Sequence, residues 1–128
     1  FSDNSIDLII SNDVFEHVPD IKKSFQELHR VLTNDGAVLF TAPFKMREDK
    51  TVQRAKLEAS GEISHFLPAE YHGNPVDEKG SLVYYDYGWD LLDLIRDAGF
   101  KKVDVVSYHS FVLGYWGARE QILFRAFK

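Results

Sequence analysis

The sequence predicts an α/β fold with two parallel strands joined by a helix, followed by a second helix and an antiparallel hairpin. Residues 6–10 (IDLII) are nearly all apolar, which is typical of a strand covered on both faces in a parallel sheet. Apolar side chains then recur with helical spacing from Ile21 to Leu32. Near the C-terminus, two β-rich runs are separated by too few residues for a crossover helix, so we expect them to pair antiparallel.

The first three elements form a predicted βαβ unit. Asp20 is a suitable N-cap for the helix that begins at Ile21. Residues 34–36 (Asn-Asp-Gly) are expected to end this helix, and residues 37–42 (AVLFTA) are typical of a second buried strand. The connection between the two parallel strands is expected to be right-handed.

The elements that follow are predicted from the same signals. A helix is expected near residues 49–60, ended by Gly61, and a polar and aromatic stretch comes after it. Asp90 is expected to cap a short helix that is closed by Gly99. Residues 102–108 and 121–127 are the two strands of the predicted hairpin.

Composition limits the class of protein. A chain of 128 residues with 45% hydrophobic content fits one folded domain. Fifteen basic and twenty acidic residues give a net charge of -5, so the basic surface that nucleic acid requires is not expected. No apolar stretch approaches the roughly 20 residues of a membrane-spanning helix. No secretory leader stands at the front and no cysteine is present, so we expect a soluble, cytoplasmic protein.

Residues 1–44 (FSDNSIDLIISNDVFEHVPDIKKSFQELHRVLTNDGAVLFTAPF) resemble the second half of class I S-adenosylmethionine-dependent methyltransferases of the diverse group called type 11. In that group, a segment like FSDNSID leads into the fourth strand, a segment like NDVFEHV follows it, and RVLTNDGAVLFTAP spans a helix end and the fifth strand. DLLDLIRDAGF is similar to the family's last helix. The resemblance implies the C-terminal half of a Rossmann-like methyltransferase sheet.

The resemblance also implies a division of the chain and an activity. Residues 1–43 correspond to the βαβ unit, residues 44–89 to an insertion facing the substrate side, and residues 90–128 to the last helix and hairpin. The implied activity is methyl transfer from S-adenosylmethionine to a small-molecule or saccharide-like acceptor. A non-catalytic half-fold that serves as an oligomerisation or binding module is the alternative. A third possibility is one half of a nicotinamide dehydrogenase, but the sequence does not resemble that class of enzyme.

The sequence departs from the family in the part that binds the cofactor. The family's glycine-rich turn after the first strand and the acidic residue that holds the ribose have no counterpart, and no G-x-G-x-G occurs. The chain starts with Phe1 and its only methionine is Met46, so we expect it to begin inside a longer protein or to have been cut. The cofactor site is therefore expected to be incomplete and the chain alone to be inactive.

The loop after Ser11 contains the predicted cofactor contacts, because ligands of open α/β sheets lie beyond the carboxyl ends of the strands. The resemblance implies that Asn12 and Asp13 border the methionine part of the cofactor, with Phe15 and His17 lining the cavity near the methyl group. The structural alternative is that Asp13 caps a turn, Glu16 is a solvated charge and His17 is hydrogen-bonded scaffolding.

Methyl transfer to a poor nucleophile requires a base, and His17 and His72 are the candidates. His65, Tyr71 and Tyr85 are the predicted acceptor-binding residues, although the aromatic run at residues 82–87 is also compatible with a packed edge strand. The spacing of His65, Glu70 and His72 matches no metal motif, so no metal is expected.

The strand that begins at Ile6 and ends at Ser11 is predicted to be an uncovered sheet edge. In the resembled fold, the fourth strand lies between the first and the fifth, and this chain contains no counterpart of the first. The strand is apolar and has no proline or lysine to prevent pairing with another strand. We therefore expect a homodimer in which two copies of this edge pair antiparallel.

Overall fold

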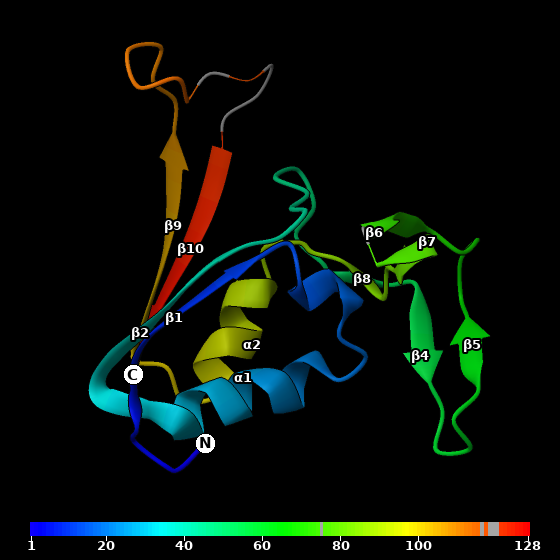
Figure 1. Ribbon diagram of the computed structural model, residues 1–128, viewed down its shortest axis with the longest axis horizontal. Coiled ribbons are helices and arrows are strands. Elements are labelled where there is room, and N and C mark those ends of the chain that lie inside the picture. The colour runs from blue at the N-terminus through cyan, green and yellow to red at the C-terminus, as the bar shows by residue number, and fades with distance from the viewer. Residues whose placement is uncertain (75, 116, 118–120) are drawn as a thin grey trace.

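The computed structural model describes residues 1–74, 76–115, 117 and 121–128. A four-stranded sheet lies at its centre, in the order β1-β2-β10-β9. Its strands are β1 (Ile6–Asn12), β2 (Leu32–Thr41), β9 (Lys102–Tyr108) and β10 (Gln121–Phe127). Helices α1 (Ile21–Val31) and α2 (Leu91–Asp97) pack against one face of this sheet (Figure 1). Neither of these helices is long and apolar enough to cross a membrane.

The core lies between the two helices and the sheet. Alternate residues of β2 and β10 face the helices, so Val38, Phe40, Phe124 and Ala126 are buried. Antiparallel pairing sets Phe124 opposite Phe40, and their rings stack 4.8 Å apart. The predicted antiparallel pairing of the two C-terminal strands is confirmed.

The predicted βαβ unit is confirmed, because β1 and β2 are parallel and α1 connects them. The Asp20 side chain accepts a hydrogen bond from the Lys23 N–H at 3.0 Å, as expected of an N-cap. The predicted helix end at residues 34–36 is wrong. α1 ends at Val31. Leu32 already has an extended backbone conformation, and its side chain is buried in the core.

β1 forms one edge of the sheet, since only β2 pairs with it in the described chain. Leu8 and Ile10 are 52% and 66% exposed, whereas Ile9 points to the other side of the strand and packs against the core. The prediction that this strand is covered on both faces is therefore wrong for the residues that the structure describes.

Most of residues 44–89 lies beside the central sheet, in three two-stranded sheets of described residues (Figure 1). β3 (Val52–Gln53) pairs with β8 (Tyr85–Asp86), β4 (Ala55–Leu57) with β5 (Ile63–His65), and β6 (Tyr71–Asn74) with β7 (Asp77–Leu82). All three pairs are antiparallel, so this part of the chain is built from short strands and turns.

The helix expected near residues 49–60 is therefore wrong, and the contacts of Arg54 explain why. The Arg54 guanidinium donates to Asp86 at 2.8 Å and lies 3.0 Å from a Glu70 carboxylate oxygen. The Arg54 backbone carbonyl accepts hydrogen bonds from Phe66 and Leu67. These partners are distant in sequence and hold the segment extended, which overrides its local preference for helix.

Asp90 precedes α2 but does not cap it with its side chain, contrary to the prediction. Its carboxylate instead accepts hydrogen bonds from the Thr51 backbone N–H at 2.7 Å and the Thr51 hydroxyl at 2.6 Å. Asp90 thus fastens the segment before β3 to the start of α2. Gly99 follows α2 with φ +112°, a left-handed conformation typical of a glycine after a helix end.

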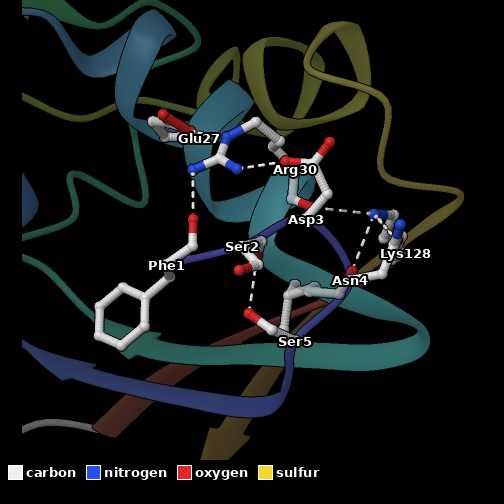
Figure 2. Close-up of polar contacts among 9 residues, drawn as sticks. Phe1, Ser2, Asp3, Asn4, Ser5, Glu27, Arg30 and Lys128 are labelled. Carbon is white, nitrogen blue, oxygen red and sulfur yellow. Dashed lines mark hydrogen bonds and ion pairs between the residues drawn. The ribbon is translucent and has the colours of Figure 1, made fainter.

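The two ends of the chain meet beside the end of α1 (Figure 2). The Lys128 ammonium donates to the Asn4 side-chain oxygen at 2.8 Å. Arg30 pairs with Asp3 and donates to the Phe1 carbonyl at 3.1 Å. These contacts fasten the turn before β1 to the helix and to the end of β10.

We propose that a second copy of the chain covers the open edge of β1. Two β1 strands running antiparallel across a two-fold axis would satisfy each other's unpaired N–H and C=O groups. The same association would set the exposed Leu8 and Ile10 side chains beside those of the second copy on one face of the joined sheet, where lysine side chains would repel one another. Leu8→Lys and Ile10→Lys are therefore expected to shift the chain toward monomer, as measured by light scattering.

Val112→Lys is the matched control for this experiment. Val112 is 91% exposed and lies between β9 and β10, at the opposite side of the sheet from β1, so its substitution is expected to leave the association unchanged. A monodisperse monomer of the unsubstituted chain at high micromolar concentration would contradict the edge-paired dimer.

Candidate functional site

A cavity of about 550 Å³ opens at the carboxyl ends of β1 and β2. Its walls come from the loops after these two strands, the β6–β7 hairpin and the start of β10. The lining residues are Asp13, Glu16, His17, Thr41, Ala42, Pro43, Phe44, His72, Gly73, Gln121 and Ile122. Its position is the one expected for a ligand in an open α/β sheet.

Asp13 lies at the mouth of this cavity in an uncommon conformation. Its φ of +49° is in the left-handed region, which disfavours residues other than glycine. The Asp13 N–H donates to the Thr41 carbonyl at 3.1 Å, and the Thr41 hydroxyl donates to the Asp13 carboxylate at 3.0 Å. The parallel pairing of β1 with β2 brings these two residues together and keeps the strained backbone in place.

The loop after β1 contains a 3₁₀ turn, η1 (Phe15–His17), which is hydrogen-bonded to residues 82–87. The Tyr85 and Tyr87 hydroxyls donate to the carbonyls of Pro19 and Phe15, each at 2.7 Å. Burial raises the pKa of both phenols, and the charge of Glu16 raises the pKa of Tyr87 further. Both hydroxyls therefore stay protonated, and able to donate, to a higher pH than an exposed tyrosine would.

Two further hydrogen bonds orient the titratable residues of this loop. The Tyr84 N–H donates to the Glu16 carbonyl at 2.7 Å. The His17 Nδ1 lies 2.8 Å from the Leu82 carbonyl oxygen. Because a carbonyl only accepts, Nδ1 carries a proton, and Nε2 is the His17 nitrogen that faces Glu16.

Glu16, His17 and His72 form a cluster at the back of the cavity. The Glu16 side chain is 0% exposed, and neither of its carboxylate oxygens has a hydrogen-bond partner in the described chain. Its Oε1 lies 3.5 Å from His17 Nε2 and 3.5 Å from His72 Nδ1. The two imidazole rings are nearly perpendicular, with centroids 5.0 Å apart. The alternative in which Glu16 is a solvated charge is therefore wrong.

Residues 1–40, which contain β1, α1 and most of β2, match the family described as a methyltransferase domain. The match covers about a third of the chain, and it ends one residue before the end of β2. The resemblance seen in the sequence is confirmed.

Two curated methyltransferases match the chain over 41 residues, or 32% of its length. Phosphoethanolamine N-methyltransferase 2 of Caenorhabditis elegans is 42% identical there, and malonyl-[acyl-carrier protein] O-methyltransferase 1 of Coxiella burnetii is 46% identical. The matched segment spans 9% and 14% of these relatives.

The crystal structure of an S-adenosylmethionine-dependent methyltransferase from Mesorhizobium loti is similar to the whole chain, with a TM-score of 0.62 at 16% identity. The match covers 64% of that protein. At this identity the likeness shows the fold: the chain is a mixed α/β structure that corresponds to part of that larger fold.

The cavity brings together some of the residues singled out in the sequence. Asp13, His17 and His72 all line it, although His72 is far from the other two in the chain. Asn12 ends β1 and does not line the cavity. The Phe15 ring is buried against Phe25 and Phe40, so it belongs to the core and not to the cavity wall.

The three predicted acceptor-binding residues lie outside the cavity lining. His65 is exposed on β5 opposite Ala55, and Tyr71 is half exposed on β6 opposite Leu82. Tyr85 uses its hydroxyl to hold the loop after β1. Their predicted contact with an acceptor therefore has no support from this cavity.

Two residues at or near the cavity were missed in the sequence. Thr41 looks like the end of a buried strand, and only the parallel register with β1 pairs its hydroxyl with Asp13. Arg54 was assigned to a helix, yet it holds Glu70, whose Oε1 lies 3.7 Å from His72 Nε2. Neither contact has a local sequence signal, because each joins residues far apart in the chain.

The strained backbone of Asp13 predicts a difference between two substitutions. Asp13→Ala and Asp13→Gly both remove the carboxylate that Thr41 contacts, but only alanine keeps the side-chain clash of the left-handed conformation. The alanine variant is expected to be less stable than the glycine variant by about 1 kcal/mol in urea unfolding. An alanine variant as stable as the glycine variant would contradict a strained Asp13.

Proposed function

We propose that this chain supplies the acceptor side of an S-adenosylmethionine-dependent methyltransferase and that methyl transfer takes place in the cavity at the ends of β1 and β2. The observation that carries the proposal is the position of the family match: it contains β1 and most of β2, and the cavity is lined by Asp13, directly after β1, and by Thr41, the last residue of β2. The volume of the cavity also falls within the roughly 300–1,000 Å³ that is typical of small-molecule sites.

The residues present fit the cofactor only in part. Asp13 offers a carboxylate and a backbone held in position at the end of β1, where the methionine part of the cofactor is proposed to lie. A glycine-rich G-x-G-x-G turn does not occur in the sequence. When bound, S-adenosylmethionine supplies an electrophilic methyl group; the ribose and the adenine need contacts beyond those found in this cavity.

His17 and His72 are the proposed proton acceptors. A hydroxyl or amine that accepts a methyl group must lose a proton, and the free Nε2 lone pair of neutral His17 can take it. The Glu16 carboxylate, 3.5 Å from His17 and from His72, would stabilise the imidazolium that forms. The apolar side chains of Phe44 and Ile122 form part of the wall and limit the access of water.

The proposed acceptor is a small molecule, including one of saccharide type. By their names, the two curated relatives methylate a nitrogen of phosphoethanolamine and an oxygen of a malonyl-[acyl-carrier protein], so they point to no shared acceptor. The lining of this cavity combines carboxylates, imidazoles and the Thr41 hydroxyl, which suits an acceptor with several hydroxyl or amino groups.

Cofactor binding by the chain alone is expected to be weak. Isothermal titration calorimetry of residues 1–128 with S-adenosylmethionine should show no binding tighter than about 100 μM, because contacts to the ribose and adenine are few. Micromolar binding would contradict this prediction and would mean that the loop after β1 suffices.

Catalysis is expected in the complete gene product that contains this chain. His17→Ala or His72→Ala should lower turnover by roughly 100-fold or more, with cofactor affinity near normal, because each removes a proton acceptor and not a cofactor contact. His109→Ala is the control, since His109 is exposed at the end of β9 and outside the cavity. Normal turnover in both cavity variants would refute their role as bases.

A further inference from the structure

The buried Glu16 carboxylate lacks the partners that such a group normally has. Burial of an ionised carboxylate is strongly unfavourable unless hydrogen-bond donors or a positive charge surround it. Both Glu16 oxygens are without a hydrogen bond, and the nearest titratable groups are the imidazoles of His17 and His72 at 3.5 Å. Among the residues that the structure describes, no lysine or arginine forms an ion pair with Glu16, so the two imidazole nitrogens are the groups that face its carboxylate.

Each histidine directs its outer nitrogen to an acceptor. His17 Nδ1 donates to the Leu82 carbonyl at 2.8 Å, which leaves Nε2 facing Glu16. His72 Nε2 lies 3.7 Å from a Glu70 oxygen, and its Nδ1 faces Glu16. Histidines that bind metals are commonly oriented in this way, by a carbonyl or carboxylate on the nitrogen away from the metal.

The separations also suit a metal ion. Bonds of 2.0–2.1 Å in a tetrahedral zinc site place the ligand atoms about 3.3–3.4 Å apart. Glu16 Oε1 lies 3.5 Å from each facing histidine nitrogen, and one atom from each of the three residues lies within 4.8 Å of the others. We propose that Glu16 Oε1, His17 Nε2 and His72 Nδ1 bind a divalent transition-metal ion, with zinc as the expected metal.

The proposed site has an open side toward the cavity. Glu16 is fully buried, but His17 and His72 are 18% and 35% exposed and line the same cavity as Asp13. Three protein ligands with an open fourth position are typical of zinc sites that bind a substrate or water, whereas structural zinc sites have four protein ligands. Two imidazoles and one carboxylate also favour zinc or iron over calcium or magnesium.

Metal binding would change the roles of the two histidines. The nitrogens that face Glu16 would be ligands and not proton acceptors, and the open position would hold an oxygen or nitrogen of the acceptor. That consequence rests on the proposed methyl transfer. The binding of the metal does not depend on methyl transfer, so the metal site and the methyltransferase function can be tested separately.

The test is zinc titration of metal-stripped chain 1–128, in competition with a chromophoric chelator and without S-adenosylmethionine. One zinc ion per chain is expected to bind with a dissociation constant of about 10 μM or lower at neutral pH. His17→Gln, His72→Gln and Glu16→Gln should each weaken binding by about 100-fold, and Glu70→Ala by about 10-fold because it acts only through His72. His109→Gln is the control and should bind zinc normally.

Cobalt provides a second readout that does not depend on affinity. Co²⁺ in a tetrahedral site gives a strong visible absorption, which should appear with the unsubstituted chain and disappear in His72→Gln. Circular dichroism of each variant shows whether it is folded, and His72, on the exposed β6–β7 hairpin, is the substitution least expected to unfold the chain. Zinc binding that is absent, or that is equal in folded His72→Gln and in the His109→Gln control, would overturn the proposal.

Discussion

The hydrogen bonds between the loop after β1 and residues 82–87 are the constraint on which the site depends. They give the Phe15, Glu16 and Pro19 carbonyls their partners, and two of the donors are tyrosine hydroxyls whose pKa values are raised by burial. Without these partners, the carbonyl groups of the loop would be shielded from water and unpaired, which would destabilise the fold. The same contacts orient His17 and enclose the Glu16 side chain.

A chain of polar contacts connects Arg54 to the cluster at the back of the cavity. Arg54 pairs with Asp86 and Glu70, Glu70 lies beside His72, and both histidines face Glu16. Groups of this kind are stable in a protein interior only when each has a partner of suitable charge or geometry. The β6–β7 hairpin therefore contributes to the site through His72, and the segment around Arg54 contributes by holding that hairpin's neighbouring carboxylate.

The central sheet supplies the other side of the cavity. Parallel pairing of β1 with β2 brings Asp13 and Thr41 together at the carboxyl ends of the two strands. The apolar face of the sheet packs against α1 and α2, which stabilises this arrangement. Leu8 and Ile10 lie on the opposite face of β1 and are exposed. The site thus lies where a rigid sheet edge meets a segment made of short strands.

The sequence by itself determined the βαβ unit, the C-terminal hairpin and the methyltransferase resemblance, because helix periodicity, the Asp20 cap and apolar strand runs are local signals. Only the tertiary structure decided that residues 49–60 are not helical, that Glu16 is buried and that His72, but not His65, joins the cavity. Arg54 shows the reason: its partners Glu70 and Asp86 are 16 and 32 residues away in the chain, and such contacts leave no periodic pattern. They form only when the whole chain folds.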